Sequence, residues 1–380
     1  MTTTTLETTT TATDWVGRAS QIGETLAPGV AGRDRLGEID LAAFEAFRAE
    51  GVTAALVPAE AGGGGASHAD AGRLLRELGR HDGATAVALS MHMHLVAAQV
   101  WRHRHGLDAS ALFRKVVERR AVLVSTGAAD WIGSSGSARK VDGGYRVRAR
   151  KSPASGCEAG NVLVTSARWE EAPGGPRVLH FAVPMTAEGV RIEKTWDTLG
   201  LRATGSHTVV LEEVFVPDAA VSLERPADVW HPVWNVILGA AMPLILSAYV
   251  GIADAAVARA LEAAKGRAES HVLQLLGEML NAHTTAADAV DAMFRDADDL
   301  RFEATDSFAG RALSRKTVAA DALIATVRLA IEATGGSGYT RSSDLERLYR
   351  DVHGVLFHPL PRARQTTFSG RAALGLAPVG

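Results

Sequence analysis

The sequence predicts a mostly α-helical fold with a β domain in its middle, and three observations predict it. Over about the first 120 residues, apolar side chains recur three and four positions apart, the spacing of amphipathic helices. Near Ala121 the pattern changes to short alternating stretches, and after Pro226 it returns to helical spacing. Strands that follow one another with no helix between them favour an antiparallel sandwich or small barrel.

Composition excludes several classes of protein. The 380 residues allow two or three domains, and a content of 47% hydrophobic and 22% charged residues is typical of globular proteins. A formal net charge of −3 is not basic enough to bind nucleic acid. Cys157 is the single cysteine, so an intramolecular disulfide is excluded and a reducing compartment fits. The N-terminus lacks a signal-peptide pattern and the apolar run 240–252 is too short for a membrane span, so we expect a cytoplasmic protein without membrane contact.

The N-terminal part divides into a tail and a helical domain. Residues 1–13 are rich in threonine with almost nothing to bury, so we expect disorder there. A helical domain follows over residues 14–120. Its expected helices cover residues 39–50, 69–80, 85–100 and 109–119.

The middle β domain is expected over residues 121–224 and a C-terminal helix bundle over residues 225–380. Tyr145, Val147 and Ala149 alternate with arginines, the two-residue repeat of a half-buried strand. Further strands are expected at residues 162–169, 178–184, 190–196 and 208–216. The bundle is expected to contain helices at residues 243–265, 272–304 and 308–334.

Two His-x-His pairs, His92/His94 and His103/His105, suggest a metal site at first sight. Residues two apart share a face on a strand, but on a helix they point about 200° apart. Both pairs lie in sequence with helical spacing, so one ion cannot be bound by both members of a pair. We expect hydrogen-bonded or solvated histidines and no metal site.

A glycine-rich segment begins at Gly335 and Gly336, after the last long helical stretch. Glycines there commonly cap a helix, and they also allow a diphosphate to approach backbone N–H groups, so the residues alone leave both interpretations open. The chain has no Gly-x-Ser-x-Gly elbow, no Gly-x-x-x-x-Gly-Lys-Ser/Thr loop and no Gly-x-Gly-x-x-Gly motif opening a helix after a strand. Hydrolases, kinases and Rossmann dehydrogenases are therefore disfavoured.

Six segments carry a family resemblance. They are Val-Pro-Ala-Glu-Ala-Gly-Gly at 57–63, Glu-Leu-Gly-Arg-His-Asp at 77–82, Thr-Leu-Gly-Leu-Arg-Ala-Thr-Gly-Ser at 198–206 with Val-Phe-Val-Pro at 214–217, and Gly-Gly-x-Gly-Tyr at 335–339 with Glu-Arg-x-x-Arg-Asp at 346–351. In their amino-acid sequences and in their order along the chain, these segments resemble the acyl-CoA dehydrogenase superfamily of flavoproteins, over about residues 15–376. The resemblance implies an N-terminal α-helical domain, an antiparallel β-sandwich or barrel and a C-terminal four-helix bundle, the same order that periodicity predicts.

The resemblance implies FAD as cofactor, bound between the β domain and the bundle. Thr126 matches the flavin-contacting Thr or Ser after the first strand, and Ser155 matches a position near the flavin N5 edge. Without the resemblance, ordinary strand and turn hydrogen bonding explains both residues equally well. Gly335 and Gly336 match the diphosphate-binding glycines, which usually serve a neighbouring subunit, so a homotetramer is implied, with a dimer as the minimum.

The catalytic carboxylate of the family's dehydrogenases is missing. Those enzymes use a glutamate to remove a proton α to a thioester. At the usual position, after the Arg-x-x-Arg-Asp helix, this chain has Pro359, and the alternative position near residues 240–242 holds no carboxylate.

Two other features resemble the monooxygenase branch of the superfamily, in which reduced flavin reacts with O₂ beside a histidine. His358 precedes the missing glutamate, and Ala154-Ser155-Gly156 replaces the Trp-Ile-Thr segment of dehydrogenases. An imidazole that titrates near neutrality suits proton donation as the O–O bond breaks, so we expect His358 to be catalytic. The alternative is a histidine that caps or packs the C-terminal helix.

A further departure concerns flavin binding. Residues 264–269 lead directly into the next helix, without the family's Arg-x-x-Phe-Gly motif. FAD is then held weakly at its adenine end, or reduced FMN or FAD is supplied by a separate flavin reductase. We expect a two-component monooxygenase acting on a small or carrier-bound molecule. Two alternatives stay open: an FAD-dependent dehydrogenase or oxidase of acyl thioesters with a relocated base, and a non-catalytic descendant without flavin.

Overall fold

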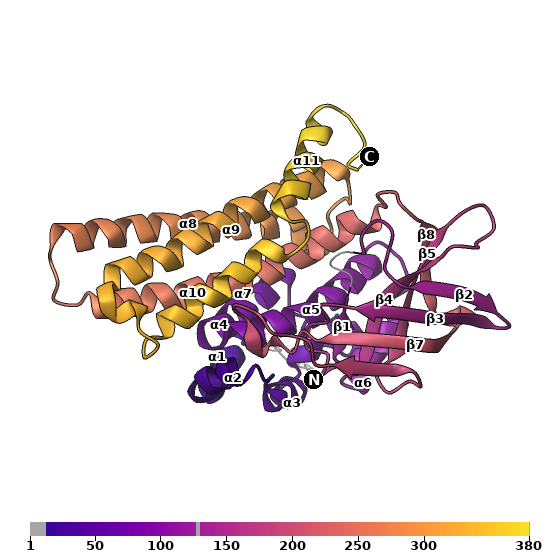
Figure 1. The fold of residues 1–380 in the computed structure, drawn as a ribbon, viewed down its shortest axis with the longest axis horizontal. Helices are drawn as coiled ribbons and strands as arrows, with labels where there is room; N and C mark the ends of the chain where they lie inside the picture. Colours follow the sequence, from indigo (N-terminus) through magenta and orange to yellow (C-terminus); the bar gives the residue numbers. More distant parts are fainter. Residues whose placement is uncertain (1–12, 127–129, 380) are drawn as a thin grey trace, which may run out of the picture.

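The computed structural model describes residues 13–126 and 130–379, so the expected disordered tail lies almost wholly outside the described residues. Figure 1 shows a sheet at one end of the molecule, long helices extending away from it, and a group of shorter helices packed beside them. The order helices, sheet, helices agrees with the sequence-based prediction. Within the described ranges, the first helices are α1 (Trp15–Leu26), α2 (Val30–Leu36), α3 (Leu41–Ala49), α4 (His68–His81), α5 (Gly83–Arg104) and α6 (Ser110–Glu118).

Side-chain caps explain where three of these helices begin. The carboxylate of Asp40 accepts a hydrogen bond from the backbone N–H of Ala43 at the start of α3. Ser67 and Asp70 form a reciprocal capping box at the start of α4. Asp82 caps α5 through the N–H of Thr85. Helices α3 to α6 therefore begin and end within a few residues of the predicted bounds.

The β domain is a single mixed sheet rather than an antiparallel sandwich or barrel. Its strands are β1 (Leu123–Ser125), β2 (Ser137–Val141), β3 (Gly144–Lys151), β4 (Val162–Trp169), β5 (Arg177–Pro184), β6 (Val190–Glu193), β7 (Thr208–Pro217) and β8 (Val221–Pro226). Their order is β6-β7-β3-β2-β4-β5-β8, and β1 pairs with β4. Both β1 and β2 run parallel to β4, while the other pairs are antiparallel. The prediction of an antiparallel domain was wrong here because β1 and β2 meet the same neighbour in the same direction.

The C-terminal helices are α7 (Val233–Ala263), α8 (Ser270–Ala297), α9 (Asp306–Thr334), α10 (Asp344–Val352) and α11 (Arg362–Ala373). Helix α7 begins ten residues before the predicted start and continues through Pro243. It is long and apolar enough to cross a membrane, but 94% of its most apolar window is buried inside the protein. Its apolar surface therefore serves as the core onto which α4, α5, α8 and α9 pack.

A close backbone contact joins the end of the β domain to α10. A Cβ on Gly200 would lie 2.2 Å from the carbonyl oxygen of Arg350, so only glycine fits there. The carboxylate of Asp351 accepts a hydrogen bond from the N–H of Leu201 at 2.6 Å. The loop that contains Gly200 is thereby held against the helix that precedes His358.

Candidate active site

Hydroxyl groups gather where β1 and β3 end. The Thr126 hydroxyl donates to Thr165 on β4 at 2.6 Å. Ser155 accepts a hydrogen bond from Ser206 at 2.8 Å, and Ser206 is in turn 2.6 Å from the hydroxyl of Thr204. Both predicted flavin contacts, Thr126 and Ser155, are half-buried, so they stay partly open to a ligand.

A buried ion pair lies at the end of β3. Lys151, at the end of β3, is 1% exposed and is paired with Asp130 in the loop that follows Thr126. The same ammonium donates to the carbonyl oxygen of Ser135 at 2.7 Å. One buried cation therefore joins the end of β3, four residues before Ser155, to Asp130 and Ser135.

Helix α5 places this region next to His358. A Cβ on Gly156 would lie 3.8 Å from the carbonyl oxygen of Ala88, so this glycine lies beside the helix. His92 accepts a hydrogen bond from the N–H of Leu123 on β1 at 3.0 Å. His94 lies close enough to His358 that a proton on His94 would lower the pKa of His358. One stretch of α5 therefore contacts the Ser155 turn, β1 and the neighbourhood of His358.

His358 is surrounded by protein on most sides and its ring is held by a tyrosine. Its Nε2 is 2.8 Å from the hydroxyl of Tyr249 on α7, and the two rings meet edge to face at 5.5 Å between centroids. Lys316 on α9 is 2% exposed, and its ammonium donates to the carbonyl oxygen of Leu360 at 3.3 Å. The site around His358 is thus formed by α5, α7, α9 and the segment after α10.

The electrostatics contradict the expectation that His358 titrates near neutrality. Burial, together with the charges of Lys316 and His94, lowers the pKa of His358 to about 3. His358 is therefore a neutral imidazole at physiological pH. Burial also lowers the pKa of Lys316 to about 8, which makes the lysine the group here that titrates closest to neutrality.

The glycines lie elsewhere in the chain. Gly335 ends α9 with a φ of 78°, and a Cβ on either Gly335 or Gly336 would meet nothing within 4 Å. They are about 28 Å along α9 from Lys316, at 1.5 Å per residue. One chain therefore does not bring these glycines together with His358. Arg267, in the short loop between α7 and α8, donates to the carbonyl oxygen of Ala333 at 3.2 Å, so an arginine stands beside the glycines although the family's motif is missing.

The His-x-His pairs make hydrogen bonds within the protein. His92 uses both ring nitrogens, on the carbonyl oxygen of Thr53 and the N–H of Leu123. His105 bonds to the carbonyl oxygen of Trp101 and stacks on its ring. Among the described residues, no group of three or more potential ligands could hold a metal ion.

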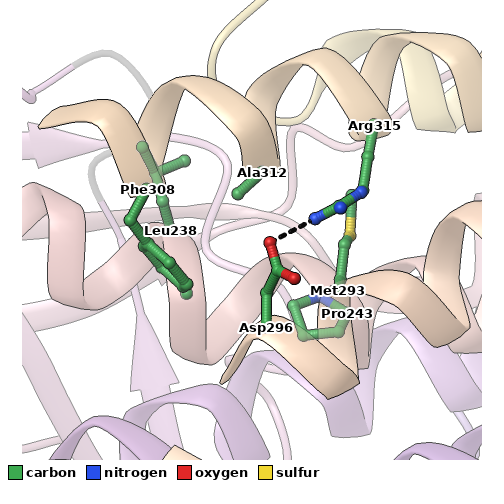
Figure 2. Close-up of a pocket in the computed structure, with 8 residues that line it drawn as sticks. Leu238, Pro243, Met293, Asp296, Phe308, Ala312 and Arg315 are labelled. Carbon is green, nitrogen blue, oxygen red and sulfur yellow. Dashed lines mark hydrogen bonds and ion pairs between the residues drawn. The ribbon is translucent and has the colours of Figure 1, made fainter. Parts of the chain in front are cut away.

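Two hollows lie outside this region. Figure 2 shows the first, between α7, α8 and α9, where Asp296 and Arg315 pair at 2.6 Å and no space remains for a water molecule. The second is an open groove of about 690 Å³ between α9 and the C-terminal segment. Its α9 residues, such as Ser307 and Ser314, lie on the face of the helix opposite Lys316.

Comparisons with known proteins agree with this architecture. The N-terminal domain of acyl-CoA dehydrogenases matches residues 19–106, and their C-terminal domain matches residues 244–361. An amino sugar nitrososynthase, DnmZ of Streptomyces peucetius, is 30% identical over 90% of this chain and 88% of its own length. A putative acyl-CoA dehydrogenase, YdbM of Bacillus subtilis, is 27% identical over 91% of this chain and 92% of its own. A solved structure of KijD3 in complex with FMN and dTDP-3-amino-2,3,6-trideoxy-4-keto-3-methyl-D-glucose has a TM-score of 0.86 and 26% identity, covering 95% of this chain and 93% of that one.

The residues present fit a flavin. Thr126 and Ser155 offer partly exposed hydroxyls just after the ends of β1 and β3. The open backbone at Gly335 and Gly336 leaves space for a phosphate beside Arg267. With both family domains matched and a relative at 30% identity over most of its length, the chain belongs to the acyl-CoA dehydrogenase superfamily, on the branch of its flavin-dependent monooxygenases.

Proposed function

We propose that this chain is the oxygenase component of a two-component monooxygenase that uses reduced FAD or FMN and oxidises an amine nitrogen. The observation that carries the proposal is the chemistry around His358. Of the two positions of the family's catalytic carboxylate, one holds Pro359 and the other, near residues 240–242, holds no carboxylate, while a neutral imidazole, a phenol and a buried ammonium are grouped around His358. The amino sugar chemistry named for DnmZ and for the KijD3 ligand supports an amine as the substrate class.

In this proposal each group has a definite task. Reduced flavin supplies two electrons and activates O₂, so that one oxygen atom enters the substrate and the other leaves as water. Thr126 and Ser155 bind the flavin ring, and Gly335, Gly336 and Arg267 bind the phosphate of a flavin that belongs to a neighbouring subunit. His358 forms a hydrogen bond at the reacting edge, and the packed helices around it exclude water.

The same arrangement supports a homotetramer, with a dimer as minimum; a cytoplasmic location and a separate flavin reductase complete the proposal. Because the glycines and His358 are far apart within one chain, a complete site needs two copies. Apolar side chains are also exposed on α8 and α9, among them Leu273, Leu280 and Val318. Light scattering of the flavin-saturated protein should give a multiple of the 40.0 kDa chain mass. A mass of one chain would remove this part of the proposal.

The reaction is tested by supplying reduced FMN or FADH₂ from a separate reductase, with O₂ and a panel of primary amines that includes nucleotide-linked amino sugars. We expect an amine product heavier by one oxygen atom, formed with consumption of O₂. The competing dehydrogenase would instead reduce an electron-accepting dye in the absence of O₂ when given an acyl-CoA. Dye reduction without any oxygenated amine would overturn the proposal.

The role of His358 is tested by His358→Ala. Product formation should fall by about 10²-fold or more, the usual effect of removing one positioned proton-handling group. Flavin affinity should stay close to that of the parent, because the residues proposed to bind flavin are elsewhere. Reduced product accompanied by released hydrogen peroxide would support the role, whereas unchanged product would make His358 a packing residue.

A further inference from the structure

Tyr249 is fully buried on α7, and its position is closely determined by its surroundings. A Cβ on Gly354 would lie 2.8 Å from the Tyr249 hydroxyl and 2.4 Å from the side chain of Leu201. Because Gly354 has no side chain, the Tyr249 hydroxyl can occupy this space. From that place the hydroxyl reaches Nε2 of His358 at 2.8 Å.

The direction of this hydrogen bond follows from the partners available. A buried hydroxyl that donates to nothing costs about 1–3 kcal/mol. Among the described residues, His358 Nε2 is the one hydrogen-bond partner of the Tyr249 hydroxyl. The hydroxyl therefore donates, and Nε2 accepts through its lone pair. A neutral imidazole that accepts at Nε2 carries its proton on Nδ1.

Burial, and after it nearby charge, disfavours a proton on both ring nitrogens of His358. Lys316 on α9 brings a buried positive charge, and His94 on α5 also acts on His358 electrostatically. A second cation beside Lys316 would be unfavourable in a site of low dielectric constant. His358 is only partly buried, and its Nδ1 atom is not one of the described atoms that are buried without a partner, so Nδ1 stays accessible to a ligand.

We infer that Tyr249 is a positioning residue that fixes His358 as the Nδ1–H tautomer, so that the imidazole presents a hydrogen-bond donor to the reacting atoms. The part of this inference that says which atoms the N–H contacts rests on the proposed function. The tautomer assignment rests on the structure and does not depend on that function. It differs from the usual expectation of a charged histidine acid, because the donor here is a neutral N–H.

The tautomer is measured by solid-state nitrogen NMR of protein labelled with ¹⁵N-histidine. The His358 signals are assigned by their loss in His358→Gln, which is needed because the chain has 13 histidines. We expect a protonated Nδ1 and an unprotonated, hydrogen-bonded Nε2 in the parent protein, and a mixture of tautomers in Tyr249→Phe. A proton on Nε2 in the parent, or identical spectra in the two proteins, would refute the inference.

A matched control comes from the same region. The Tyr349 ring packs against His353 at 4.7 Å, but His353 bonds to the backbone oxygen of Tyr349 rather than to its hydroxyl. Tyr349→Phe should therefore leave both the spectrum and turnover unchanged, while Tyr249→Phe lowers product formation about tenfold, the effect of one lost buried hydrogen bond.

The two readouts separate the two hypotheses. The spectrum does not depend on turnover, so the expected tautomer combined with full activity of His358→Ala would overturn the proposed role of His358 and leave the tautomer assignment standing. A changed spectrum in Tyr249→Phe with unchanged product formation would show that the tautomer has no role in the reaction, and would overturn the positioning role.

Discussion

Replacing Lys151 with methionine removes the cation that joins the end of β3 to the loop after Thr126. The ammonium is buried with Asp130 and also reaches the backbone and hydroxyl oxygens of Ser135, at 2.7 and 3.1 Å. Methionine fills a similar volume, so the main effect is an unpaired Asp130 carboxylate inside the protein. Breaking a buried pair in this way costs about 3–5 kcal/mol. For a chain of 380 residues this corresponds to a melting temperature lower by about 4–6 °C.

The double variant Asp130→Asn/Lys151→Met separates pairing from packing. It removes both charges of the Lys151–Asp130 pair, and replacing a whole buried pair by uncharged groups of similar size is often close to neutral. We therefore expect it to melt at least about 3 °C above Lys151→Met. Scanning calorimetry measures the difference, and equal melting temperatures for the single and double variants would refute the reasoning.

Lys140→Met is the matched control, because Lys140 lies on the adjacent strand β2 and pairs with Asp218 on the surface, with 43% of its side chain exposed. Its removal should shift melting by about 1 °C or less. Flavin titration provides a second measurement. Lys151→Met should weaken flavin binding because the loop next to Thr126 is released, and Lys140→Met should not.

Two further predictions concern stability. Burial lowers the pKa of five histidines to about 3 or 4, so below about pH 6.5 the unfolded chain binds protons that the folded chain does not. The free energy of unfolding should therefore fall between pH 6.5 and 4 by up to about 1.4 kcal/mol per pH unit for each histidine, and Asp351, with a pKa raised to about 6, offsets one of them. A free energy of unfolding in urea that did not change with pH would contradict this prediction. The five are His68, His92, His94, His180 and His358. Gly200→Ala should destabilise the chain by roughly 1–3 kcal/mol because its Cβ would clash with the Arg350 backbone, whereas Gly370→Ala, which meets open space on α11, should not; equal unfolding midpoints for the two would contradict the clash.

Local pattern predicted best those elements that have clear turn signals at both ends. Strand β4 was predicted with its bounds, 162–169, because the residues before and after it are turn formers. The start of helix α7 was predicted ten residues too late because the helix is apolar on all faces and contains Pro243, so periodicity has no contrast to detect there. The parallel pairing of β1 with β4 could not be predicted, since it depends on contacts between segments about 40 residues apart.

The candidate site shows the same division. Thr126, Ser155 and His358 were found through their place in family motifs. Tyr249 and Lys316 stand singly in long helices, and nothing in their local sequence marks them. Their importance comes from packing that brings Tyr249 onto a residue 109 positions later in the chain. Sequence reasoning also predicted a histidine titrating near neutrality, since it could not include the burial and the neighbouring ammonium that lower its pKa.

The buried ammonium explains more than the pKa of His358. Removal of a proton α to a thioester needs a carboxylate that is strongly basic, and a positive charge nearby makes a carboxylate less basic. A glutamate at position 359 would lie next to Leu360, whose carbonyl oxygen accepts a hydrogen bond from Lys316. That glutamate would therefore be held ionised by Lys316 and would be a poor base. A donor to developing negative charge on oxygen, in contrast, works better beside a cation. The electrostatics around His358 thus suit oxygen transfer and oppose dehydrogenation, independently of the missing glutamate.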